Sequence, residues 1–164
     1  MEIPKRKRNR LKNYDYSEPG VYFITICSKD RKWLFWDVGA SSARPGSTSH
    51  FSRIGYTIDE KIHCISQMYR YIKVDNYVIM PNHVHLLLSY FYSNNGRALL
   101  APTPSISHVI QQFKGAVTKS TGISVWQKSF HDRVVRNEKE YRFIYEYITN
   151  NPFKWDEDSF YIQS

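Results

Sequence analysis

The stretch YVIMPNHVHLLLSY, residues 77–90, decides which fold this chain is expected to adopt. Strand-like sequence before and after Pro81-Asn82 predicts one strand over 71–80 and a second over 83–90. A turn this short cannot contain the crossover of about a dozen residues that joins parallel strands. We therefore expect the two strands to be antiparallel neighbours.

The rest of the chain alternates strands with helices. Residue patterns predict a strand over 20–28, helices over 54–72, 106–119 and 137–150, and a short strand with a turn over 124–135. The segments 37–52 and 91–105 are expected to be loops. This order predicts an α+β fold, with one antiparallel sheet and helices packed on one face.

Each predicted helix carries an apolar stripe with the spacing of one buried face. The stripes are Ile58, Ile62, Ile65 and Tyr69 in the first helix, Val109, Phe113, Ala116 and Val117 in the second, and Tyr141, Ile144, Tyr145 and Ile148 in the third. Asn137 is a candidate cap for the last helix. Pro152 must end that helix, because proline lacks the amide hydrogen that would continue it.

Length and composition predict one domain, residues 1–164, with a nucleic-acid partner. The chain carries 23 Lys and Arg against 15 Asp and Glu, a net charge of +8, and 16% aromatic residues. Cations neutralise phosphates and aromatic rings stack on bases, so this composition favours nucleic acid over a merely solubilising excess of charge.

The sequence predicts a cytoplasmic, nucleoid-associated protein with no membrane contact. It has neither an apolar run of about 18 residues nor a secretory leader. Cys27 and Cys64 form no CxxC motif and are expected to be reduced thiols. The segment 1–13 is a candidate DNA-binding arm, with a solvated tail as the alternative; its cations are Lys5, Arg6, Lys7, Arg8, Arg10 and Lys12.

His83 and His85 are spaced so that both side chains leave the same face of a strand. Val84, Leu86 and Leu88 alternate with them and are the better core candidates, so the imidazoles are expected to point off the side opposite the core. Two neutral imidazoles at this spacing can chelate one metal ion. The alternative is a pair of hydrogen-bonded surface histidines. The other histidines show no partnering pattern; they are His50, His63, His108 and His131.

Tyr147 and Asn151 lie four residues apart, so their side chains are expected to share one face of the last helix. An Asn oxygen can bind a hard metal ion, and a Tyr hydroxyl beside it is a candidate nucleophile. Tyr141 and Tyr145 fall on the apolar stripe and are expected to pack inward. From the helix alone, an ordinary ring packed at the helix edge is the favoured interpretation of Tyr147.

The segment MPNHVHLLL resembles the histidine–hydrophobic–histidine (HUH) motif of single-tyrosine transposases. Three further segments resemble the REP-associated tyrosine transposases, relatives of small insertion-sequence transposases: RKRNRLKNYDYSEPGVYFITIC, APTPSISHVIQQFKGAVTK and VWQKSFHDRVVRNEKEYRFIYEYITNNPFKW. The resemblance spans nearly the whole chain, with 37–52 and 91–100 its least characteristic parts. It implies a ferredoxin-like HUH-endonuclease fold.

The resemblance also implies a metal-dependent enzyme that cuts and rejoins single-stranded DNA. His83, His85 and Asn151 would hold Mg²⁺ or Mn²⁺. Tyr147 would attack a phosphodiester, giving a 5′-phosphotyrosine link and a free 3′-OH. The partner would be palindromic repeat DNA folded into a hairpin, contacted by the arm 1–13 and, as weaker candidates, by Lys114, Arg133 and Arg136. The protein would act as a monomer or a homodimer.

Two other functions remain open on the sequence. One is a catalytically silent protein that binds repeat DNA, against which the intact set of His83, His85, Tyr147 and Asn151 argues. The other is an RNA-binding module, which the charge and aromatic content favour. The chain lacks the RNP and GXXG signatures of common RNA-binding modules.

Overall fold

The computed structural model describes residues 18–37, 50–91 and 104–157. They form β1 (Gly20–Cys27), α1 (Arg53–Met68), β2 (Ile72–Ile79), β3 (His83–Tyr90), α2 (Ile106–Thr121), β4 (His131–Val135) and α3 (Glu138–Asn150). Two short 3-10 segments follow β1 and α3; these are η1 (Lys29–Arg31) and η2 (Asn151–Glu157). The predicted elements are present, with ends that shift by a few residues. The predicted arm and most of both predicted loops lie outside the described residues.

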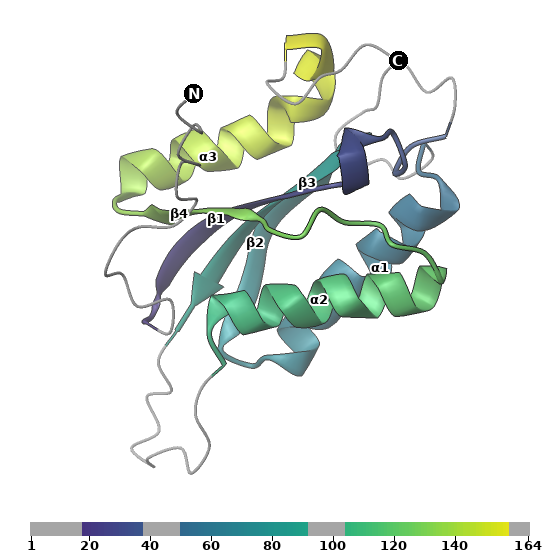
Figure 1. The fold of residues 1–164 in the computed structure, drawn as a ribbon. Coiled ribbons are helices and arrows are strands. Elements are labelled where there is room, and N and C mark those ends of the chain that lie inside the picture. The colour runs from purple at the N-terminus through teal and green to yellow at the C-terminus, as the bar shows by residue number, and fades with distance from the viewer. Residues whose placement is uncertain (1–17, 38–49, 92–103, 158–164) are drawn as a thin grey trace, which may run out of the picture.

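The four strands form one antiparallel sheet in the order β2-β3-β1-β4 (Figure 1). β3 pairs with β2 on one side and with β1 on the other, and β4 lies at the edge beside β1. This order, built from a β-α-β-β-α-β chain, is the ferredoxin-like arrangement. The predicted antiparallel α+β class is therefore confirmed.

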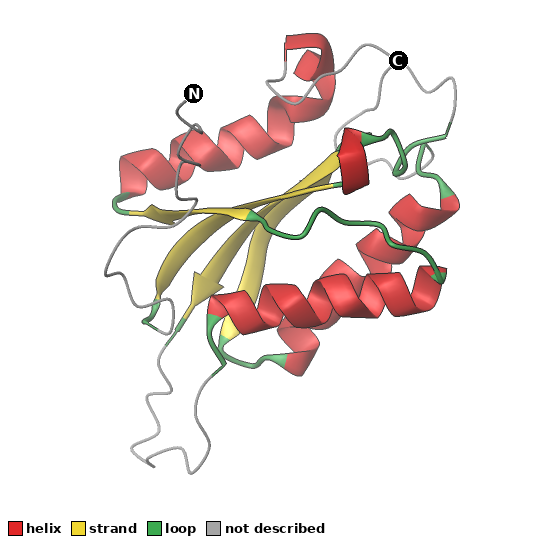
Figure 2. Cartoon of the chain, viewed as in Figure 1, coloured by secondary structure: helices red, strands yellow, loops and turns green. Residues whose placement is uncertain are grey.

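The larger core lies between the sheet and the pair of helices α1 and α2 (Figure 2). Val84, Leu86 and Leu88 of β3 point into it and are fully buried, as the strand alternation predicts. The predicted stripes of α1 and α2 face them from the other side; their buried members are Ile58, Ile62, Ile65, Val109, Phe113 and Val117.

A smaller core lies on the opposite face of the sheet, under α3 (Figure 2). Its buried members are Leu87, Val135, Ile144 and Ile148. The expectation that the helices pack on one face is therefore correct for α1 and α2 only. β3 carries apolar side chains on both of its faces, so each face needs a cover to exclude water.

The stripe that α3 buries is narrower than predicted. Ile144 and Ile148 are buried and Tyr141 is half-buried, but Tyr145 is 41% exposed, which corrects the expectation that its ring packs inward. Tyr145 lies about 100° around the helix from Ile144, and the small core reaches only a thin strip of α3. Asn137 caps the helix as predicted, because its side-chain oxygen accepts a 2.9 Å hydrogen bond from the Glu140 amide.

No helix in the described parts of the chain is both long enough and apolar enough to cross a membrane.

Candidate active site

β3 brings both histidines to the face of the sheet that α3 covers. His83 and His85 are 0% and 1% exposed. They point away from the larger core as predicted, but the prediction missed their burial because it placed no helix on this face. Figure 1 shows the C-terminal end of α3 above the end of the sheet at which β3 begins.

Each imidazole is held by a hydrogen bond through its Nδ1 atom. His83 Nδ1 lies 2.9 Å from the Asn82 side-chain oxygen, and His85 Nδ1 lies 2.8 Å from Thr25 Oγ1. A carboxamide oxygen only accepts, so Nδ1 of His83 carries the proton and its Nε2 atom keeps a lone pair. Thr25 faces His85 because the two residues are paired across β1 and β3. These contacts fix the orientation of both rings.

The two Nε2 atoms face each other at 3.1 Å. Burial, and secondly the positive charge of Arg31, lower the pKa of His83 to about 3. A pKa this low keeps the His83 ring neutral at physiological pH. The pair therefore presents converging nitrogen atoms, and such a pair can share a proton or bind one cation.

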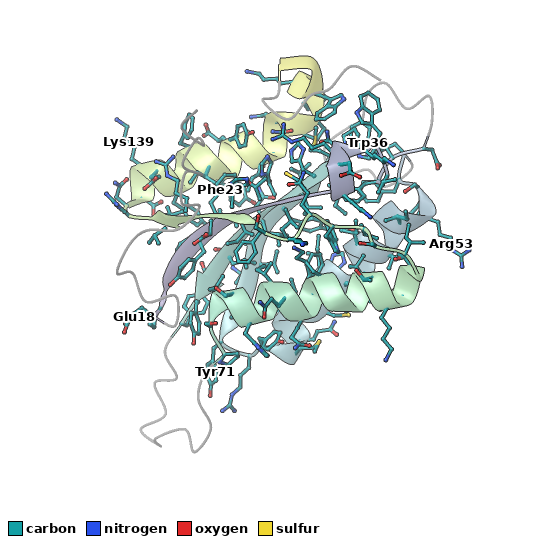
Figure 3. The ribbon with its side chains drawn as sticks, in the orientation of Figure 1. Glu18, Phe23, Trp36, Arg53, Tyr71 and Lys139 are labelled. Atoms are coloured by element: carbon teal, nitrogen blue, oxygen red, sulfur yellow. The ribbon has the colours of Figure 1, made fainter. Side chains whose placement is uncertain are left out.

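Tyr147 reaches the histidine pair from α3. Its hydroxyl lies 3.4 Å from His85 Nε2, and its ring stands edge-on to Phe23 at 6.2 Å. Figure 3 labels Phe23 in the layer between the sheet and α3. Tyr147 is 37% exposed, so this residue links the buried imidazoles to the protein surface. The structure thus joins Tyr147 to the histidines, 62 residues away in sequence.

Polar contacts fix α3 above the site. The Asn76 side-chain amide donates to the Tyr145 carbonyl oxygen at 3.0 Å and to Thr149 Oγ1 at 2.9 Å. Asn76 belongs to β2, so these bonds tie the helix to the sheet on both sides of Tyr147 in sequence. They hold the register of the tyrosine relative to the histidines.

The segment after α3 carries Asn151 and Trp155, and Trp155 borders the site. Asn151 is buried one helical turn beyond Tyr147, at the start of η2. Trp155 is also buried, and its ring centre lies 5.8 Å from that of His83. η2 thus places an aromatic ring beside His83, with the buried Asn151 four residues earlier in the same segment.

The histidine pair fits a divalent cation. Two nitrogen ligands at about 2.1 Å from one ion, and about 90° apart, are separated by about 3.0 Å. The observed 3.1 Å between the Nε2 atoms matches this spacing. Among the residues that the structure describes, no group of three or more His, Cys, Asp or Glu side chains could hold a metal ion. Within the described ranges, a third protein ligand would be a residue of another type, and the Asn151 amide oxygen is the predicted one.

Three of the predicted DNA-contacting cations, Lys114, Arg133 and Arg136, lie within the described residues. The ammonium of Lys114 donates to the carbonyl oxygens of Gln127, Lys128 and Ser129 at 2.6, 3.2 and 3.4 Å. These bonds occupy its three hydrogens, so the geometry argues against the predicted phosphate contact. Arg133 is exposed and paired with Glu140, and Arg136 is exposed at the end of β4. DNA contacts by both arginines stay predictions.

Sequence reasoning missed the residues elsewhere in the chain that contact the two histidines or lower the pKa of His83. These are Thr25, Phe23, Arg31 and Trp155. Asn82 directly precedes His83, so the motif itself shows that these two residues are close together. The register of β1 against β3, which selects Thr25, left no local signal.

No protein-family model matches the chain. The chain is similar to an uncharacterized protein of Haemophilus influenzae (strain ATCC 51907 / DSM 11121 / KW20 / Rd), with 30% identity over 177 residues that cover 98% of this chain and 95% of the relative. The chain belongs to the family of that protein.

Among solved structures, this member of the family is similar to a REP-associated tyrosine transposase bound to a REP hairpin. The TM-score is 0.61 with 19% identity, and the match covers 89% of this chain and 74% of the other. The chain therefore has a REP-associated tyrosine transposase-like fold, in agreement with the resemblance of its motifs.

Proposed function

We propose that this protein is a metal-dependent endonuclease and strand transferase that acts on single-stranded DNA. The observation that carries the proposal is the 3.4 Å approach of the Tyr147 hydroxyl to the buried, converging histidine pair. A nucleophile beside a site for a cation is the minimum set for phosphoryl transfer to a protein side chain. The transposase-like fold supports the same chemistry.

Tyr147 is the nucleophile in this proposal. Its oxygen attacks the phosphorus of a DNA phosphodiester, and the bond from phosphorus to the 3′ oxygen breaks. The hydroxyl passes its proton to water at this partly exposed residue, and the departing 3′ oxygen takes a proton from water. The products are a 5′-phosphotyrosine link and a free 3′-OH. A 3′-OH can reverse the step and join strands, because the covalent link retains the bond energy.

His83, His85 and Asn151 are the proposed protein ligands of a divalent ion. When bound, Mg²⁺ or Mn²⁺ would polarise the scissile phosphate and offset the charge that develops on its oxygens. The neutral state of His83 leaves a lone pair available for this role. Asn82 and Thr25 hold the two rings in the required orientation.

The proposed substrate is palindromic repeat DNA whose single strand folds into a hairpin. The net charge of +8 suits a polyanionic partner, and the structural relative is bound to a REP hairpin. The arm 1–13, Arg133 and Arg136 are proposed to contact the backbone. Both a monomer and a homodimer are compatible with an active site in which Tyr147 and the histidines come from one chain.

The test is covalent capture of DNA by the full-length protein. Labelled hairpin DNA with a single-stranded flank is incubated with the protein, with Mn²⁺ or with EDTA, and run on a denaturing gel. We expect an adduct with Mn²⁺ from the unaltered protein and from Tyr145→Phe, and none from Tyr147→Phe. Tyr145 is the matched control because it is an exposed tyrosine on the same helix.

Three results would overturn parts of this proposal. Retention of hairpin DNA without an adduct would identify a silent repeat-binding protein. A preference for RNA of the same sequence would favour an RNA-binding module. An adduct from Tyr147→Phe, mapped by mass spectrometry to another tyrosine, would show that Tyr147 is not the nucleophile.

A further inference from the structure

An exposed turn directly after β1 lies beside the histidine site. We name Ser28–Trp33 the β1 turn. Its three cations, Lys29, Arg31 and Lys32, are all exposed. In Figure 1 this turn, in purple, lies at the end of the sheet where β3 begins. Asn82, which directly precedes His83, is hydrogen-bonded to this turn, which agrees with this placement.

The backbone of the β1 turn is unusual. Asp30 and Arg31 both have left-handed conformations, with φ of 57° and 53°, and within the described residues they are the only non-glycine residues with positive φ. Side chains disfavour this region, and it persists only where surrounding contacts impose it. Strained residues of this kind concentrate at functional sites, so the turn is a candidate for one.

Specific hydrogen bonds impose this conformation and join the turn to the active-site strand. Ser28 Oγ donates to the Lys32 carbonyl oxygen at 2.7 Å, which closes the turn on itself. The Ser28 amide donates to the Asn82 carbonyl oxygen at 2.8 Å, and the Asn82 side-chain amide donates to the Arg31 carbonyl oxygen at 3.4 Å. Asn82 therefore holds both His83 and the β1 turn.

An aromatic pair extends the turn toward the site. Trp33 is 38% exposed, and its ring stands edge-on to Trp155 at 5.7 Å. Trp155 in turn lies 5.8 Å from His83. Exposed cations and a partly exposed tryptophan, side by side, are the two components with which proteins bind single-stranded nucleic acid.

We propose that the β1 turn binds single-stranded DNA next to the scissile phosphate, with Arg31 on a backbone phosphate and Trp33 against a neighbouring base. The inference rests on the proposed function, because it names the part of the protein that holds the strand for Tyr147. Arg31 and Trp33 are binding and positioning residues. The hydrogen bonds with Asn82 position the turn relative to His83.

The test measures DNA binding in EDTA, so that it does not depend on cleavage. The probe is a fluorescent oligo-dT of 12 nucleotides, titrated at several salt concentrations. We expect Arg31→Gln to lower the slope of log K against log salt by about 0.7, the value for one phosphate contact on a single strand. The matched control is Lys139→Gln, an exposed cation at the far end of α3 (Figure 3). An unchanged slope in Arg31→Gln, or an equal fall in the control, would overturn the phosphate contact.

Trp33 is tested by removal and by conservative replacement. We expect Trp33→Ala to weaken oligo-dT binding about fivefold or more, and Trp33→Phe to retain most of the affinity, because phenylalanine still stacks. In the unaltered protein, a probe with 5-iododeoxyuridine at successive positions is photocrosslinked, and the crosslink is mapped by mass spectrometry. We expect Trp33 as the site. Crosslinks confined to other parts of the chain would overturn the inference even where Trp33→Ala does not fold.

The two proposals can fail separately. Weaker binding by Arg31→Gln in EDTA, together with no adduct from the unaltered protein in Mn²⁺, would support the binding surface and reject the cleavage chemistry. An adduct from the unaltered protein, together with unchanged binding by Arg31→Gln and Trp33→Ala, would do the opposite.

Discussion

The two faces of the sheet differ in what their cover helices bury. The face under α1 and α2 is a broad apolar core, to which β3 contributes Val84, Leu86 and Leu88. Among the residues that the structure places, the face under α3 holds a buried cluster of four apolar residues, together with His83 and His85. Adjacent residues of one strand therefore belong to regions with different tasks.

This difference shows how a small protein can bury polar groups without losing its fold. Buried polar groups cost stability unless each is hydrogen-bonded, so they are best concentrated away from the main core. The α3 face provides partners for both histidines, Thr25 and Asn82. The α1/α2 face supplies apolar burial, and the α3 face carries the candidate chemistry.

The largest effect is expected from removing an imidazole from the α3 face. His83→Ala or His85→Ala should lower adduct yield about a hundredfold or more, because a bound metal contributes several kcal/mol to such a step. Hairpin affinity should stay within a few-fold. The control is His63→Ala, an exposed histidine on α1 that pairs with Asp59. Full activity in either active-site variant would reject the metal assignment.

Substitutions at two neighbouring leucines of β3 allow a direct comparison of the two faces. Leu86 and Leu87 are both fully buried, on opposite sides of the sheet. Leu86→Ala should lower the free energy of unfolding by about 4 kcal/mol, because the large core cannot collapse around the cavity. Leu87→Ala should lower the free energy of unfolding by about 2 kcal/mol, since α3 can move onto the sheet and fill part of the cavity. Its adduct yield should nevertheless fall further than that of Leu86→Ala. Urea unfolding gives the first quantity. If both variants lost the same free energy of unfolding and the same adduct yield, the distinction between the faces would be rejected.

A smaller effect is expected from removing the hydrogen bonds that anchor α3 to the sheet. Asn76→Ala removes two hydrogen bonds to the helix and should lower the free energy of unfolding by about 1 kcal/mol. Adduct yield should fall several-fold, because Tyr147 loses its fixed register. Glu146→Gln, exposed on the same helix, should change neither quantity. A loss of DNA affinity in EDTA would instead indicate that Asn76 contacts DNA.

The smallest effect concerns Lys114 on the α1/α2 side. Lys114→Gln should lower the free energy of unfolding by about 1 kcal/mol through its lost bonds to three carbonyl oxygens. The salt dependence of hairpin binding by Lys114→Gln should match that of Lys119→Gln, because Lys119 is an exposed cation on the same helix. If the slope of log K against log salt were smaller for Lys114→Gln than for Lys119→Gln, the DNA contact that the sequence predicts for Lys114 would be supported.

Local periodicity determined much of this protein. The short Pro81-Asn82 turn requires an antiparallel pair, strand alternation places His83 and His85 on one face, and Asn137 begins α3 as a cap. Each of these features depends on residues within one element or one turn, so the sequence contains the whole signal.

Only the tertiary structure decided what surrounds those residues. It placed α3 on the second face, buried the histidines, exposed Tyr145, and set Thr25 opposite His85. It also engaged Lys114 with carbonyl oxygens and brought the β1 turn to Asn82. These outcomes arise from strand register and from helix packing between distant segments, and side-chain spacing within one segment does not specify either of them.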